Sequence, residues 1–445
     1  MLKSNPDYSL QHQREGEENL IQRPNIWHFG MQPFLLGFFR NSFFFIFFIA
    51  FFISCKKEKS PSTPGVITGR KNLCPGETGV IFSIDPVEIS TYYLWTVPDD
   101  AQITSGQGTT SIIVTFGKKS GSICVRSNSN KEVSEASCVE VAQGGVSDTW
   151  CRQMDFNAGA RTEGVGFSIG NKGYVGTGVD AIAGQHRDFW EFDPELNEWT
   201  QKADFGGVAR FDAVGFSIGN KGYIGTGYIG TAYLKDFWEY DPLSNVWLQK
   251  ADCGDTPRGF AFSFSIGNKG YVGSGSDDFF STRTDFLEYD PDLNQWTQKA
   301  AVVPRNVGAG FSIGNKGYLA CGTDGSSSFN DFWEFDPTDT SDGFDINNDP
   351  IGKWNQKASF PGAQRYGSVG FSIGNKGYVG TGYDGNLNYN DFFEFDPLSN
   401  TWVQRADFAG EVRGYGVGFS IGGNGYIGIG NNADGALGNF WVYGQ

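Results

Sequence analysis

The chain has 445 residues and a formal net charge of −16 at pH 7, with 34 basic and 50 acidic side chains. This acidic balance argues against nucleic-acid binding, which requires a basic face. Seven cysteines occur without a Cys-x-x-Cys pair, so a structural zinc site is not expected. The length is sufficient for more than one hydrophobic core.

The N-terminal segment indicates export from the cytoplasm. Residues Met1–Gly30 are polar and acidic, and we interpret them as an extension upstream of a true start at Met31. The apolar run Phe43–Ile53 follows Arg40 and is too short to cross a bilayer core of about 30 Å. Residues 31–54 are therefore predicted to be a secretory signal peptide.

The sequence Phe52-Ile53-Ser54-Cys55 resembles the lipobox of bacterial lipoproteins. The resemblance implies that Cys55 carries lipid and that acyl chains hold the protein at a membrane. The alternative is an ordinary signal peptide or membrane anchor in which Cys55 is incidental. Residues 55–64, polar and containing Ser and Pro, are expected to be a tether. We predict a lipid-anchored protein of the cell envelope, at the outer membrane, with the face it occupies left open.

Residues 65–145 are predicted to form a separate β-sandwich. Apolar and polar residues alternate in segments such as Tyr93–Val97 and Ser111–Phe116, with turn residues between them. The stretch from Leu94-Trp95 to Val114 resembles bacterial PKD-like domains, which have an immunoglobulin-like fold. The resemblance implies a spacer. Cys124 and Cys138 flank a predicted hairpin and are suitably placed to pair, although spacing alone does not establish connectivity.

A six-fold repeat occupies the rest of the chain. Its core, Gly-Phe-Ser-Ile-Gly-Asn-Lys-Gly-Tyr-Val-Gly-Thr-Gly, recurs with small changes at Gly166–Gly178, Gly215–Gly227, Ser263–Gly275, Gly310–Gly322, Gly370–Gly382 and Gly418–Gly430. In the first copy, predicted strands cover Val165–Ile169, Tyr174–Thr177, Asp188–Phe192 and Glu198–Lys202. Four short antiparallel strands per repeat are typical of a β-propeller blade.

The sequence also predicts how the ring closes. Five repeats end in a strand carrying a Trp, but the sixth stops at Phe440–Tyr443 without one. A matching strand occurs upstream, at Asp148–Gln153 with Trp150. We therefore expect this N-terminal strand to complete the sixth blade and to remove the exposed sheet edges.

Four features of the repeats resemble the kelch repeat: an Arg before the inner strand, a Gly-Tyr pair at the start of the second strand, an Asp-Pro pair after the third strand and a Trp in the fourth strand. The resemblance covers roughly residues 147–445, which we predict to be the propeller domain. The usual adjacent Gly pair is spaced here, as in Gly176-Thr177-Gly178. The resemblance implies an all-β, six-bladed propeller but does not specify a function. Kelch copper oxidases need two His ligands, and His186 is the only histidine after the signal peptide.

One arginine stands six residues before the Phe of each Phe-Ser-Ile motif. The six are expected at the entry to the inner strands, around one mouth of the central channel; they are Arg161, Arg210, Arg258, Arg305, Arg365 and Arg413. One interpretation is a cationic mouth that binds carboxylates or acidic peptides. The other is structural, with each Arg bonded to its own or a neighbouring blade.

The loops on this predicted face vary between repeats and carry aromatic residues. Tyr228 and Tyr366 are candidate ligand contacts, together with Tyr233, Phe279, Phe280, Phe329 and Tyr389 in the loops, although such rings also pack loop against loop. We expect a non-catalytic lipoprotein that binds a carbohydrate, protein or peptide here. The alternatives are a sialic-acid mutarotase with Glu163 or Asp212 as base, and a purely structural scaffold.

Three smaller features complete the predictions. The acidic insert Asp339–Asp349 is interpreted as a solvated loop, with calcium binding as the alternative. Cys151, Cys253 and Cys321 are expected to be buried thiols. No catalytic residue, cofactor or metal is assigned.

Overall fold

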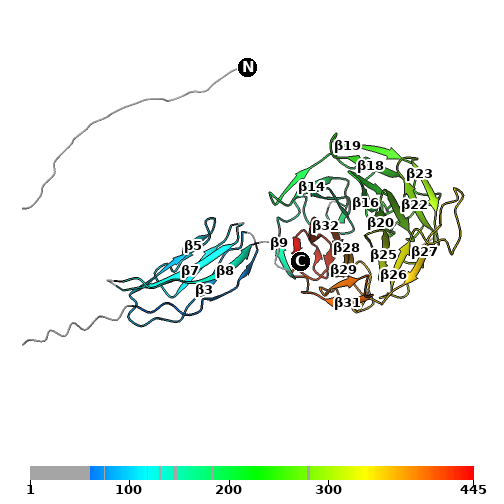
Figure 1. Cartoon of the computed structure of the whole chain (residues 1–445). Helices are drawn as coiled ribbons and strands as arrows, with labels where there is room; N and C mark the ends of the chain where they lie inside the picture. The colour runs from blue at the N-terminus through cyan, green and yellow to red at the C-terminus, as the bar shows by residue number, and fades with distance from the viewer. Residues whose placement is uncertain are drawn as a thin grey trace, which may run out of the picture. The chain divides into compact units, whose positions relative to one another are not determined.

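The computed structural model describes residues 61–444, apart from 75, 118, 130–131, 144–147, 183 and 278–280. The described chain is all β, with a sandwich followed by a propeller (Figure 1). The expected N-terminal extension, signal peptide, most of the tether, and Cys55 itself lie outside the described residues. Within the described part of the chain, no helix has the length and apolar character needed to cross a membrane.

The sandwich consists of two four-stranded sheets. One has the order β1 (Thr68–Gly69), β3 (Val80–Ser83), β6 (Ser111–Thr115), β5 (Gln102–Ser105). The other has the order β2 (Asn72–Leu73), β8 (Ser137–Gln143), β7 (Gly121–Asn128), β4 (Tyr92–Thr96). Neighbouring strands are antiparallel except β2 and β8, which pair in parallel.

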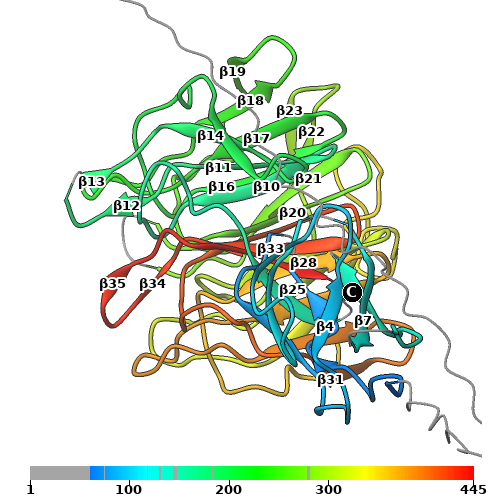
Figure 2. The ribbon, with the colours of Figure 1, turned by 90° about the vertical axis from the view of Figure 1, so that its left-hand side faces the viewer.

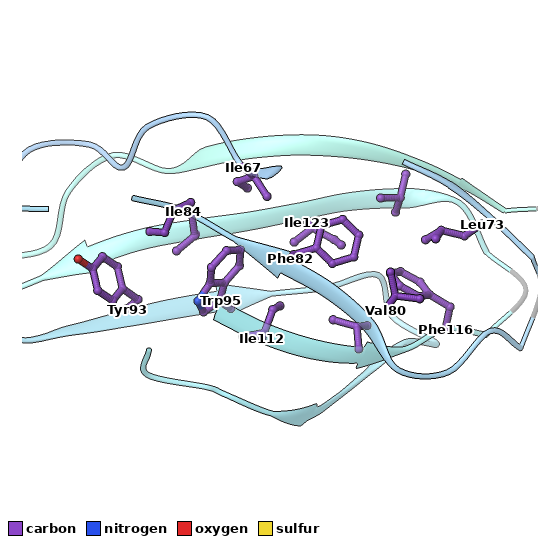
Figure 3. Close-up of a cluster of buried hydrophobic side chains, with 13 residues drawn as sticks. Ile67, Leu73, Val80, Phe82, Ile84, Tyr93, Trp95, Ile112, Phe116 and Ile123 are labelled. Atoms are coloured by element: carbon purple, nitrogen blue, oxygen red, sulfur yellow. The ribbon is translucent and has the colours of Figure 1, made fainter. Parts of the chain in front are cut away.

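Alternating apolar residues of these strands build one core between the two sheets (Figure 3). Trp95 is 2% exposed, and its indole N–H donates to the Thr109 carbonyl at 2.8 Å, so its polar atom is satisfied inside the core. Cys124 and Cys138 are paired residues of β7 and β8 and form a disulfide. The predicted pairing of these two cysteines is confirmed.

Six four-stranded antiparallel sheets form the propeller in the described part of the chain, and Figure 1 shows them arranged around a central opening. From inner to outer strand they are β10 (Val165–Ile169), β11 (Lys172–Gly176), β14 (Phe189–Asp193), β15 (Glu198–Gln201); β16 (Val214–Ile218), β17 (Lys221–Gly225), β18 (Phe237–Asp241), β19 (Val246–Lys250); β20 (Phe262–Ile266), β21 (Lys269–Gly273), β22 (Phe286–Asp290), β23 (Gln295–Gln298); β24 (Ala309–Ile313), β25 (Lys316–Ala320), β26 (Phe332–Asp336), β27 (Lys353–Gln356); β28 (Val369–Ile373), β29 (Lys376–Gly380), β30 (Phe392–Asp396), β31 (Thr401–Gln404); and β32 (Val417–Ile421), β33 (Asn424–Gly428), β36 (Phe440–Gly444), β9 (Thr149–Arg152). The second strand of the first blade begins at Lys172 rather than Tyr174, because the turn is tighter than expected and Lys172 pairs with Ile169.

The N-terminal strand closes the ring. β9 pairs antiparallel with β36, with Trp150 opposite Tyr443. The Trp150 indole N–H donates to the Ala406 carbonyl, just as Trp402 donates to Ala358 in the preceding complete blade. β9 therefore performs the role of a fourth strand, and the predicted closure is confirmed.

Neighbouring blades interlock through a repeated contact between a phenylalanine and a glycine. The Phe of each Phe-Ser-Ile motif packs against the Gly of the Lys-Gly-Tyr or Asn-Gly-Tyr segment in the next blade. A Cβ atom on Gly222 would lie 2.5 Å from the Phe167 ring, and one on Gly173 would lie 2.5 Å from the Phe419 ring. Because the second of these contacts joins the sixth blade to the first, the same packing continues around the whole ring.

The prediction that Cys151 of β9 is a buried free thiol is wrong. Cys151 forms a disulfide with Cys74, which follows β2. This pair was not predictable from the spacing of the cysteines, because the two residues are 77 positions apart. Cys253 and Cys321 are free and buried, in agreement with the prediction.

Two short hairpins occur in loops between second and third strands: β12 (Val179–Asp180) with β13 (Gly184–Gln185), and β34 (Asn431–Asn432) with β35 (Gly435–Ala436). They project from the same side of the ring (Figure 2). We call this side the loop face.

Candidate functional site

The six arginines lie inside the blades and not on an exposed mouth. Their exposure is 0–2% in every blade. The interpretation that these side chains form a cationic ring accessible to a ligand is therefore wrong. The alternative interpretation, in which each arginine has a structural role, agrees with their burial. The physical reason is that the two terminal nitrogens of each guanidinium donate hydrogen bonds to partners within its own blade.

Arg210 shows this arrangement. Its Nη1 and Nη2 donate to the two carboxylate oxygens of Asp236 at 2.6 and 2.8 Å, and its Nε donates to the Val208 carbonyl at 3.0 Å. Its guanidinium also lies 4.8 Å from the centre of the Phe205 ring. Burial opposes ionisation of Asp236, but the hydrogen bond and charge of Arg210 outweigh it and hold the pKa of Asp236 below its ordinary value.

Each arginine also supports a strained residue at the end of the second strand. Arg210 Nη1 donates to the carbonyl of Thr226 at 2.8 Å, and Thr226 has a φ of 60°. The same bond holds the carbonyls of five equivalent left-handed residues, Thr177, Ser274, Cys321, Thr381 and Ile429. Because left-handed backbone is unfavourable for residues with a Cβ, the arginines stabilise the route of the chain onto the loop face.

The acidic partner is 26 or 27 residues after the arginine in five blades: Asp188, Asp236, Asp285, Asp331 and Asp391. This constant spacing is visible in the sequence and would have revealed the pairing. In the sixth blade the partner is Asn439, to whose side-chain oxygen Arg413 donates. Without the buried carboxylate, burial dominates and lowers the pKa of Arg413 to about 10.

Two residues after each arginine, the chain forms a ring at the channel mouth. Its members, in order, are Glu163, Asp212, Phe260, Val307, Gly367 and Tyr415, all with φ between 51° and 63°. The backbone N–H of each donates to the carbonyl of the preceding member at 2.8–3.2 Å, and the Glu163 N–H donates to Tyr415. We call this closed circle the mouth ring. It gives a uniform backbone to side chains that differ in every blade.

The mouth ring borders a central cavity of about 180 Å³, whose other lining residues come from the inner strands and the positions just before them and are mainly Gly, Ala, Ser and Val, with Phe262. Glu163 and Asp212 are neighbours in the ring, and their carboxyl groups are hydrogen-bonded to each other. Burial raises the pKa of Glu163 to about 7, although the hydrogen bond with Asp212 opposes this shift. Burial and the charge of Glu163 raise the pKa of Asp212 well above its ordinary value. The pair therefore holds a shared proton near neutral pH.

A second cavity, of about 570 Å³, lies on the loop face and is called the groove here. It contains both predicted contact residues, Tyr228 and Tyr366. The rings of Tyr228 and Tyr233 pack at a tilted angle with their centroids 4.6 Å apart, and the centroids of Tyr366 and Tyr415 are 6.0 Å apart. Tyr415, Phe260 and Val307 line both cavities, so the groove leads to the mouth ring.

The groove also carries hydroxyl groups and carboxylates. Among its lining residues are Ser326–Ser328 and Thr323, with Asp324 and Asp384. Backbone hydrogen bonds from Ser327 and Ser326 hold the pKa of Asp324 below its ordinary value, and the Tyr389 hydroxyl does the same for Asp384. Among the described residues that line the groove or the central cavity, there is no Lys or Arg. The surface is therefore negative.

The other candidate residues have different roles. The rings of Phe329 and Tyr389 lie 5.4 and 4.0 Å from the guanidinium groups of Arg305 and Arg365, so they cover buried arginines. Phe279 and Phe280 lie outside the described residues.

In the acidic insert, Asp345 is paired with Lys299 at 2.7 Å and accepts backbone bonds from Asn347 and Asp349. No cluster of three potential metal ligands occurs among the described residues.

Comparisons with known proteins agree with the two-domain architecture. Residues 60–141 match the PKD-like domain family. The solved structure of YjhT superposes with a TM-score of 0.55 at 17% sequence identity, covering 65% of this chain and 95% of YjhT. No curated protein matches the chain by sequence. At this identity, the structural similarity demonstrates the fold alone.

Proposed function

We propose that the propeller is a non-catalytic binding module whose groove takes a carbohydrate on the loop face. The observation that carries this proposal is the composition of the groove, in which tyrosine rings adjoin hydroxyl groups and carboxylates. Aromatic faces stack on the apolar faces of sugar rings, and the polar groups accept or donate hydrogen bonds to sugar hydroxyls. The negative lining disfavours an acidic ligand, and the buried arginines offer such a ligand no counter-charge.

A glycan array followed by calorimetric titration tests this proposal. Tyr366→Ala and Tyr228→Ala should each weaken binding of the best glycan about ten-fold, since one aromatic contact of this kind is worth roughly 1.4 kcal/mol. Tyr92→Ala in the sandwich, which removes a tyrosine that is 45% exposed, is the control and should leave affinity unchanged. Absence of binding to any glycan, or equal affinity of all three variants, would favour the scaffold alternative.

An enzymatic role is the second candidate, and the Glu163–Asp212 pair is the observation that favours it. A carboxyl pair with one proton near pH 7 has the chemistry of a general acid and base. The kelch repeats that this chain resembles also occur in six-bladed epimerases of sialic acid. An acidic sugar would, however, find no cation among the described lining residues. Anomer exchange of sialic acid followed by NMR tests this candidate; catalysis lost in Glu163→Gln would replace the non-catalytic proposal.

We propose further that Cys55 anchors the protein in the cell envelope, at the outer membrane. The two disulfides support an oxidising compartment. Cys55→Ser should release the protein from the membrane fraction or block removal of the signal peptide. Unchanged fractionation together with an unchanged mature mass would contradict lipid anchoring.

A further inference from the structure

The mouth ring is chemically two-sided. Its hydrogen bonds place the residues in the order Tyr415, Glu163, Asp212, Phe260 along one arc, so an acidic pair lies between two aromatic residues. The other arc consists only of Val307 and Gly367, which leave space beside the acidic pair. This asymmetry arises from the ring positions that vary between blades, while the backbone path is the same in all six.

Asp212 has an unfulfilled hydrogen-bonding requirement. The residue is 8% exposed and lines the central cavity. The side chain is hydrogen-bonded to Glu163, and Oδ2 is buried with no other hydrogen-bond partner among the described residues. A buried carboxyl oxygen without a donor is unfavourable, so this atom is suited to accept from a donor that a ligand brings.

The surroundings favour a positively charged donor. The titratable groups that face the pair are Tyr415 and, behind it, Tyr366, both of which are neutral at pH 7. The groove adds the carboxylates Asp324 and Asp384. The six arginines are engaged within the blades, five of them with carboxylates, and do not line either cavity. The resulting field attracts cations and repels anions.

An ammonium group fits these constraints better than a bare metal ion. It has three N–H donors for the two carboxyl groups, and its charge interacts favourably with the faces of the flanking aromatic rings. Two carboxyl groups alone form an incomplete oxygen shell for a divalent metal, which takes six or more ligands.

We propose that the arc of Tyr415, Glu163, Asp212 and Phe260 binds the free primary ammonium group of an amino sugar whose other rings lie in the groove. This inference rests on the proposed carbohydrate-binding function and specifies its ligand class. Binding of the ammonium releases the proton shared by the two carboxyl groups to the solvent. The affinity for the amine therefore increases as the pH rises toward about 7, where Glu163 loses its proton, and decreases again at higher pH, where the amine is no longer an ammonium.

The test compares two oligosaccharides that differ in one group. Calorimetric titration of the full mature chain uses the β-1,4-linked tetramer of glucosamine and the same tetramer in its fully N-acetylated form. Near pH 7, where part of the amine is still protonated and Glu163 is partly ionised, the free-amine tetramer should bind roughly ten-fold more tightly, because a charge-assisted contact is gained. Titration in two buffers of different ionisation enthalpy should show proton release by the protein only with the free amine.

Variants assign the effect to the acidic pair. Asp212→Asn and Glu163→Gln should reduce affinity for the glucosamine tetramer to that of the acetylated form. Glu198→Gln changes an exposed carboxylate of β15 and should have no effect. Thermal unfolding of each variant verifies that the propeller is intact.

The possible outcomes are distinguishable. Equal affinity for both tetramers, with Tyr366→Ala still weakening both, would overturn the ammonium site and leave the proposed carbohydrate binding in place. Failure of both tetramers to bind, while other glycans bind, would also overturn the ammonium site alone. No binding of any glycan would overturn both proposals. A lysine peptide that binds through Asp212 where the glucosamine tetramer does not would overturn the assignment to an amino sugar.

Discussion

Replacing one of the buried arginines tests the structural role of all six. In Arg210→Ala, the two bonds to Asp236, those to the Thr226 and Val208 carbonyls, and the contact with the Phe205 ring are lost together. Breaking a buried ion pair from one side costs about 3–5 kcal/mol, because the remaining charge keeps its desolvation. The side chain of Asp236 is 23% exposed, so water can partly hydrate it and we expect a value near 3 kcal/mol.

For a domain of this size, about 2 °C of melting temperature corresponds to each kcal/mol, so Arg210→Ala should lower the melting temperature by roughly 6 °C. Differential scanning calorimetry measures this shift. Arg152→Ala is the matched control: Arg152 also contacts both oxygens of an aspartate, Asp155, but its side chain is 58% exposed. Its loss should cost less than about 1 kcal/mol.

Two further measurements separate the structural role from a binding role. Asp236→Asn in the Arg210→Ala background should restore part of the lost stability, because it removes the unpaired charge. Glycan affinity at a temperature well below the transition should remain unchanged in both variants. An unchanged melting temperature together with lost binding would refute the structural interpretation and would return the arginines to the ligand site.

Three other predictions concern the ring. Asn439→Asp gives Arg413 the carboxylate that the other blades have but removes the bond that Asn439 donates to Glu411. Combined with Glu411→Gln, which removes the repulsion between the two carboxylates, it should raise the free energy of unfolding by about 1 kcal/mol in denaturant titration; a decrease would show that the buried charge pair is not stabilising. Trp150→Ala should lower the melting temperature about as much as Trp199→Ala, since both indoles are buried at equivalent positions. A much smaller effect at Trp150 would contradict closure by β9. Asp212→Asn should stabilise the protein by about 1–3 kcal/mol at pH 8 and less at pH 4, because burial and the charge of Glu163 raise the pKa of Asp212 well above its ordinary value of 3.8, so the folded protein loses stability as the pH rises above that value. Equal effects at both pH values would contradict the charge coupling.

Much of the fold could be predicted because its information is local and repeated. Each of the first five repeats has alternating apolar residues, two turns and a Trp in its last strand, and these features specify a four-stranded blade without knowledge of the rest. The absence of a Trp strand after Tyr443 and its presence at Trp150 were sufficient to predict closure. Cys124 and Cys138 were predictable for the same reason, since one hairpin brings them together.

The positions of the functional side chains depended on contacts between distant residues. Each arginine was correctly placed at the entry to an inner strand, but the direction of its side chain depends on an aspartate in the third strand, which reaches it only after the blade has formed. The disulfide between Cys74 and Cys151 likewise joins segments that only the folded chain brings together.

The candidate site itself is a product of ring closure. Glu163 and Asp212 belong to different repeats, and their sequence positions identified them as possible bases but not as a pair. They become neighbours because the mouth ring aligns the same position of every blade around one axis. The repeat pattern of the sequence therefore determined the scaffold, since each blade is a local solution to burying its own apolar residues. The chemistry of the mouth was decided only by the tertiary structure, because its charge, burial and free acceptor arise from side chains contributed by separate blades.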